Sequence, residues 1–191
     1  MRQPMKLLKH PMVLAAVATG MGLLVPASAL AAASATVTGT VSGSTLSLST
    51  TATPSFSDNL DLGDQTQPFS VPLTAQDTRG TGAGWNLTVT STQYTTGGGS
   101  PSTLATTASS LTGVTSTCAS GTCTNPTNAT TYPVAVPAGS TAPTAVKFFS
   151  AAANTGMGKF TVTPTIGVFV PQNTTAGTYT STLTLAVVSG P

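Results

Sequence analysis

The sequence predicts an all-β protein, an antiparallel β-sandwich of immunoglobulin-like character that forms a single domain. Threonine, serine, valine and glycine are abundant, while charged residues make up only 5% of the chain. Such a composition suits half-buried strands and disfavours helices. From residue 35 onward, short segments alternate apolar and polar residues between Gly, Pro and Asn punctuation, and apolar residues do not recur at helical spacing over a useful length.

The first residues have the pattern of an export signal. A basic segment over residues 2–10 precedes an apolar stretch over residues 11–25, and Ala29-Leu30-Ala31 fits the small-x-small rule of a signal peptidase site. The apolar stretch is shorter than the ~20 residues that a membrane-spanning helix needs, which makes a retained membrane helix the weaker interpretation. We therefore predict a signal peptide over 1–31, a mature domain over 32–191, secretion to the cell wall or surface, and no membrane contact after cleavage.

The predicted mature domain has few charges, and this excludes several function classes. It contains three cations, four aspartates, no glutamate and no histidine. Nucleic acid binding needs clustered Lys and Arg, so that partner class is excluded. Ser-His and Cys-His catalysis require histidine, and no motif places two aspartates across a cleft as a glycosidase requires. The sequence therefore predicts a protein that is not an enzyme and needs no cofactor.

Six segments carry the strand pattern. The clearest begins at Trp85, where Trp85, Leu87 and Val89 point to one side and the intervening polar residues to the other. Pro72 places its own segment at a sheet edge or a bulge. The predicted strands are a hairpin of 35–41 with 45–50, then 69–75 and 85–94, and a second hairpin of 160–170 with 179–188 across the loop 171–177.

Between residues 97 and 143 the alternation weakens, and we predict a long Ser/Thr/Gly-rich loop insertion with short strands near Leu104 and over 132–136. Long loops are more often functional or mobile than structural, so specificity is expected here. Cys118 and Cys123 lie within this insertion, separated by a Ser-Gly turn. In an exported chain an isolated pair at this spacing predicts a local disulfide, which fixes the shape of its loop.

The segment over residues 73–89, LTAQDTRGTGAGWNLTV, is the most distinctive part of the chain. It holds Trp85, which is the only tryptophan, and an Asp77-x-Arg79 pair followed by three alternating glycines. We predict that Asp77 and Arg79 pair with each other and hold the loop that enters the Trp85 strand. The competing interpretation is that Arg79 contacts carboxylates or phosphates of the cell wall.

This segment resembles the WxL surface domain of Gram-positive bacteria. Trp85-Asn86-Leu87 matches the first Trp-x-Leu motif of that family, and the resemblance extends over roughly residues 36–191. The second motif is degenerate in YTSTLTLAVVSGP, because Leu185 occupies the tryptophan position and Val187 the leucine position. The resemblance implies an exported β-rich domain that associates non-covalently with peptidoglycan, and possible partnership with other wall-associated surface proteins.

The sequence leaves the role of the motif residues open. An alternating strand with Trp85 and Leu87 on one face is more often core than ligand platform, and the same holds for Leu185 and Val187. The closely spaced aspartates are weak candidates for calcium, because they lack EF-hand spacing and a closing glutamate. The candidate binding or motif residues are Asp77, Arg79, Trp85, Leu87, Leu185 and Val187, and the weak metal candidates are Asp58, Asp61 and Asp64.

Two functions from different classes fit these observations. The first is a secreted cell-wall-binding protein of WxL type, supported by the resemblance and by a polar surface with few charges that suits neutral glycan. The second is a structural subunit of a surface filament or adhesive layer, for which an exposed edge strand would pair with the next copy.

Overall fold

The computed structural model describes residues 36–191 and is all-β over that range, with ten strands and a single-turn 3-10 helix, η1 (Leu60–Leu62). Residues 40–191 form one compact unit. The predicted signal peptide and its cleavage site lie outside the described residues. Within the described part, no helix is long and apolar enough to cross a bilayer.

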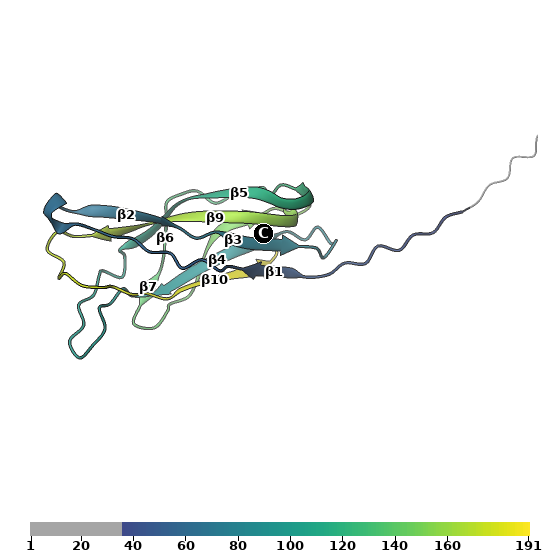
Figure 1. Cartoon of the computed structure of the whole chain (residues 1–191). Helices are drawn as coiled ribbons and strands as arrows, with labels where there is room; N and C mark the ends of the chain where they lie inside the picture. The colour runs from purple at the N-terminus through teal and green to yellow at the C-terminus, as the bar shows by residue number, and fades with distance from the viewer. Residues whose placement is uncertain (1–35) are drawn as a thin grey trace, which may run out of the picture. The chain divides into compact units, whose positions relative to one another are not determined.

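The strands form two sheets, which Figure 1 shows as two layers. The long strand β9 is the centre of the larger sheet, with β5 on one side and both β2 and β3 on the other. The larger sheet comprises β1 (Leu46–Ser49), β2 (Gln65–Ser70), β3 (Leu73–Asp77), β5 (Ser109–Thr124), β6 (Val134–Ala135) and β9 (Met157–Val170). The smaller sheet comprises β4 (Trp85–Thr92), β7 (Ala138–Gly139), β8 (Val146–Ala151) and β10 (Leu183–Ser189).

The main apolar core lies between the two sheets, and a smaller cluster contains Leu104, Ala108, Val168 and Val170. Leu87 and Val89 of β4 pack in the same cluster as Phe160 and Val162 of β9, and all four are fully buried. Their alternation along each strand follows the period of two that a pleated strand imposes. The predicted all-β class is confirmed, and the pairs are antiparallel except for a two-residue parallel contact of β4 with β7. The immunoglobulin-like character stays a prediction.

Prolines divide the predicted strand 69–75 into two. The strands β2 and β3 pair with consecutive stretches of β9, and the break between them falls at Val71-Pro72, opposite Pro164. Neither proline has an N–H for the ladder, so regular pairing cannot run through this point. The N–H of Val71 instead donates to the carbonyl of Pro164 at 3.1 Å.

Both predicted hairpins are wrong. Residues 36–45 form no strand, and β1 pairs with β3 instead. At the other end of the chain, β10 pairs with β4 in the smaller sheet, while its predicted partner β9 lies in the larger one. Local alternation identifies a strand, but the partner depends on contacts that are distant in sequence.

The prediction of a loop insertion over 97–143 is wrong for its central part. Residues Ser109–Thr124 form the 16-residue strand β5, which pairs along β9 from Ser109 opposite Val168 to Thr124 opposite Met157. Ser109 and Leu111 are its only buried side chains. Because the rest of the strand is held mainly by backbone pairing, its Ser/Thr-rich sequence shows no apolar alternation.

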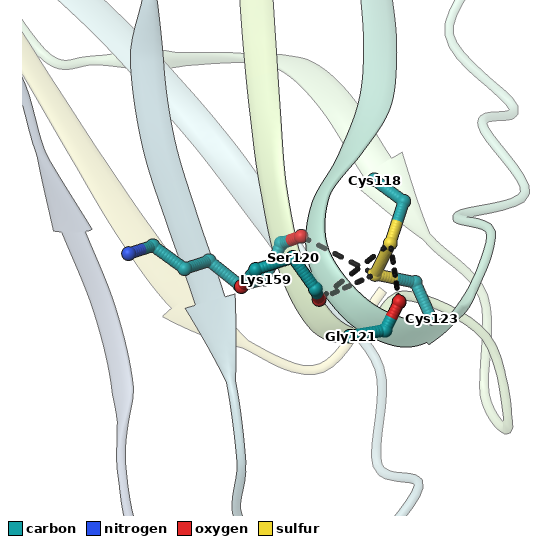
Figure 2. The surroundings of a disulfide bond; sticks show 5 residues. All are labelled: Cys118, Ser120, Gly121, Cys123 and Lys159. Atoms are coloured by element: carbon teal, nitrogen blue, oxygen red, sulfur yellow. Dashed lines mark hydrogen bonds between the residues drawn. A yellow bond between two sulfur atoms is a disulfide. The ribbon is translucent and has the colours of Figure 1, made fainter.

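The predicted disulfide between Cys118 and Cys123 is present. Figure 2 shows it at the end of β5, with the side chain of Lys159 directed away from it. The sulfur of Cys123 lies 3.3 Å from the carbonyl oxygen of Lys159 on β9. Bonded sulfurs have no proton to donate, so this is a packing contact. The ring interrupts regular register, which shifts between Cys118 and Ser120 and again before Thr124.

Replacing both cysteines by serine should lower the free energy of unfolding by about 2 kcal/mol, because the closed ring is short and the denatured chain loses little entropy to it. Urea unfolding measures the difference, with the wild-type protein under non-reducing conditions as reference. Pairing of β5 with β9 before Cys118 does not require the ring. A double serine variant that fails to fold would contradict this limited role.

Candidate functional site

The Trp-x-Leu motif lies in the core. Trp85 is 1% exposed and Leu87 is fully buried. The indole N–H of Trp85 donates to the carbonyl of Gly156 at 2.9 Å, and its ring packs against Phe149 with centroids 5.8 Å apart. Of the two roles left open by the sequence, the structure therefore places this motif in packing and away from solvent.

The close approach of Gly156 explains why the indole fits. Its backbone has a φ of 68°, and a Cβ there would lie 2.7 Å from Nε1 of Trp85 and 2.5 Å from the Cβ of Ala151. Only glycine adopts this conformation at low cost and leaves that space free. The sequence showed no sign of this partner, because Gly156 is 71 residues from Trp85.

The degenerate second motif lies directly beside the first. In the antiparallel register of β10 and β4, Val187 is opposite Leu87 and Leu185 is opposite Val89. Both residues of β10 are half-buried and pack against the main core. Leu185, which occupies the second tryptophan position, thus packs against the core as a smaller side chain than tryptophan.

Asp77 and Arg79 form a bidentate ion pair. Nε of Arg79 donates to Oδ1 of Asp77 at 2.9 Å, and Nη2 donates to Oδ2 at 2.8 Å. Asp77 is 4% exposed. The hydrogen bonds from the Arg79 guanidinium hold the pKa of the Asp77 carboxyl below its ordinary value, against the opposing effect of burial.

The same guanidinium joins the ends of the two motif strands. Nη2 of Arg79 also donates to the carbonyl of Gly84, directly before β4, at 2.8 Å. Nη1 donates to the hydroxyl of Ser189, at the end of β10. The N–H of Gly190 reaches the same Gly84 carbonyl at 3.1 Å. Arg79 is therefore engaged inside the molecule, as the clamp interpretation predicted, since each of its three guanidinium nitrogens donates to a group of the protein.

Two of the three weak metal candidates, Asp58 and Asp64, accept hydrogen bonds from separate partners. Oδ1 of Asp58 accepts from the side chain of Gln67 at 2.6 Å, whereas Oδ1 of Asp64 accepts from the N–H of Gln172 at 2.8 Å. Asn59, rather than an aspartate, caps η1 by accepting from the N–H of Asp61. Within residues 36–191, no three acidic, histidine or cysteine side chains are grouped so that they could hold a metal ion.

A cavity that sequence reasoning missed lies at the other end of the sandwich from Trp85. It has a volume of about 580 Å³ and opens between the segment that precedes β2 and the connection from β9 to β10. Figure 1 shows these two segments at the same end of the sheets. We call it the aromatic cavity, and its large aromatic and aliphatic lining residues are Phe56, Leu60, Phe69, Tyr94, Leu104, Val170, Tyr179 and Leu183.

The aromatic rings of this cavity are only partly covered by protein. Phe56 stacks on Phe69 with centroids 6.3 Å apart and meets the ring of Tyr94 edge-on at 5.8 Å. Burial raises the pKa of Tyr94 above its ordinary value. The hydroxyl of Tyr179 donates to the carbonyl of Thr175 at 2.8 Å and holds the connection that forms one wall.

The polar lining of the aromatic cavity consists mostly of hydroxyl groups, and Asp58 is its one charged residue. Oδ2 of Asp58 is buried without a hydrogen-bond partner in the protein. The sequence offered no signal for this site, since Phe56 and Tyr179 are far apart in the chain and only the fold brings them together. The sequence made Asp58 a weak calcium candidate, whereas the structure places this residue in the lining of the cavity.

Comparisons with known proteins identify the family. A search of curated proteins and a search of solved structures returned no match. The family described as WxL domain, surface cell wall-binding, matches residues 29–191, which is most of the chain and includes both motif strands. The chain therefore belongs to the WxL domain family of surface cell-wall-binding proteins.

Proposed function

We propose that the protein is exported, is not a catalyst, and is held on the cell wall by non-covalent binding to peptidoglycan. Membership of a surface cell-wall-binding family supports the location and the kind of partner. Because the core encloses Trp85 and Leu87, the wall contact in this proposal is made by other residues.

The observation that carries the proposal is the chemistry of the described surface. Arg79 and Asp77 neutralise each other inside the fold, so few charges remain for an external partner. Threonine and serine side chains dominate the exposed faces of the strands, as in β5, where six of the nine exposed positions carry hydroxyls. Hydroxyl-rich surfaces of low charge exchange hydrogen bonds with the hydroxyl and amide groups of a glycan.

Purified protein should therefore sediment with isolated peptidoglycan sacculi and be released by denaturant, as expected for non-covalent attachment. Retention should change little when salt is added, since exposed ion pairs do not carry it. The control is an unrelated β-sandwich of similar size. Protein that remains in the supernatant like this control would contradict the proposal, and ordered polymers formed without wall material would indicate the filament subunit instead.

A further inference from the structure

We propose that the aromatic cavity is the glycan site and binds an uncharged sugar unit of the wall polysaccharide. This inference rests on the proposed function, because it names the surface and the ligand class through which the wall is held. It concerns the far end of the sandwich from the Trp-x-Leu motif, as Val170 and Leu183 line the cavity while Trp85 lies opposite Ser189.

The size of the cavity suits a short oligosaccharide. Its volume of about 580 Å³ falls within the range of small-molecule sites, which is roughly 300 to 1,000 Å³. A second hollow of about 280 Å³ adjoins it and shares Leu104, Thr174, Thr175 and Tyr179. The residues that line the second hollow are uncharged, so a neutral chain could continue from one hollow into the other.

The aromatic rings favour a sugar over a fully polar ligand. Trp85, Phe148, Phe149 and Phe160 are buried in the main core, each 4% exposed or less. Phe56, Phe69, Tyr94 and Tyr179 instead pack only partly against the smaller apolar cluster beneath the cavity. Covering an aromatic face that borders an open cavity with an apolar surface removes both surfaces from water, which is favourable. The C–H face of a pyranose ring is such a surface.

The polar groups favour a ligand that donates hydrogen bonds. Oδ1 of Asp58 is occupied by Gln67, but Oδ2 is buried and unpaired. A buried acceptor without a partner is costly, and because Asp58 lines the cavity, a rotation of its carboxylate towards the cavity would let a ligand hydroxyl satisfy it. Ser55, Ser57 and Thr178 add hydroxyls that both donate and accept. Lipid chains would leave these groups unpaired, and anions would meet the carboxylate without any cation in the lining.

The test is calorimetric titration of the purified full-length protein with a β-1,4-linked tetramer of N-acetylglucosamine. Wild-type protein should bind it with an affinity that does not change on adding salt. Asp58→Ala removes the unpaired acceptor and should weaken binding about tenfold. Phe56→Ala removes an aromatic face and should weaken it at least as much. Phe169→Ala is the matched control, since Phe169 is 42% exposed and lies outside the cavity lining.

Thermal melts of each variant separate lost binding from lost folding, and Asp58→Ala decides if Phe56→Ala does not fold. The inference is overturned if the wild type fails to bind the tetramer, if the folded variants bind like Phe169→Ala, or if tetramethylammonium competes for the site in a salt-dependent way, which would assign the cavity to a cation.

Sacculus sedimentation of the same variants separates the two proposals. Loss of retention in the cavity variants supports both. Equal retention of all variants means that the wall is bound elsewhere, which overturns the cavity inference and leaves the proposed function in place. A wild type that binds the tetramer but not sacculi overturns the proposed function and leaves the cavity as a glycan site without a role at the wall.

Discussion

Trp85→Ala should destabilise the protein by about 3 to 5 kcal/mol, a large share of the stability of a typical domain. The indole is 1% exposed and packs on Phe149, so its removal opens a cavity in the core between the sheets. The substitution also removes the hydrogen bond that the indole N–H donates to the carbonyl of Gly156. Urea unfolding followed by circular dichroism measures the loss.

Trp85→Phe is the control for the ring itself. Phenylalanine keeps an apolar ring at this position and loses the hydrogen bond to Gly156, so its destabilisation should be smaller than that of alanine. The folded fraction of either variant should bind sacculi as the wild type does, because the side chain is enclosed. A Trp85→Ala protein of normal stability that no longer binds sacculi would show that the indole is a ligand contact and would refute its core role.

Arg79→Ala should destabilise the protein by about 3 kcal/mol, since it leaves the nearly enclosed carboxylate of Asp77 without its partner. The loss also removes the guanidinium hydrogen bonds to the carbonyl of Gly84, directly before β4, and to the hydroxyl of Ser189, at the end of β10. The Gly84 carbonyl keeps only the N–H of Gly190. Asp77→Ala should cost less, because the side chain of Arg79 is 17% exposed and retains access to water. The double variant should lose less than the sum of the two single variants.

Acid should weaken the same interaction. The folded-state pKa of Asp77 is lowered by Arg79, so the pair contributes stability above the unfolded-state pKa of about 4. That contribution is lost as the pH falls through the lower folded-state pKa. Melting temperatures measured from neutral to acid pH should therefore fall more steeply for the wild type than for Asp77→Ala. The clamp hypothesis would be contradicted if the single and double variants showed additive, negligible changes in melting temperature. It would also be contradicted if the melting temperatures of the wild type and Asp77→Ala fell in parallel with acid.

The features that the sequence predicted correctly depend on residues close together in the chain. Trp85, Leu87 and Val89 alternate along one strand, and the structure buries all three. Asp77 and Arg79 are two residues apart, and few other charges compete for either one. Cys118 and Cys123 are separated by five positions. In each case, the geometry of a strand or turn already brings the groups together, so the pattern carries the information.

Strand β5 is an element that the local alternation of apolar and polar residues did not predict. Its Ser/Thr-rich sequence predicts a loop, because it shows no apolar alternation. Only Ser109 and Leu111 are buried, and Val114 and Cys123 pack partly against the core. The segment forms a strand because its backbone pairs with that of β9, and backbone pairing does not require apolar side chains. Strand β10 was recognised, but its partner β4 was not, since pairing is a property of two segments.

By itself, the sequence determined the all-β class, the Trp85 strand, the Asp77–Arg79 pair, the disulfide and the resemblance to the WxL family. Alternation of apolar and polar residues, short spacings and sequence motifs are local properties of a chain, so they can be recognised without knowledge of the fold. Only the tertiary structure decided that Trp85 is core, that Arg79 joins the ends of β4 and β10, and that Phe56, Asp58, Tyr94 and Tyr179 surround one cavity. Burial and cavities arise from contacts between segments that are distant in sequence, so no single stretch of residues specifies them.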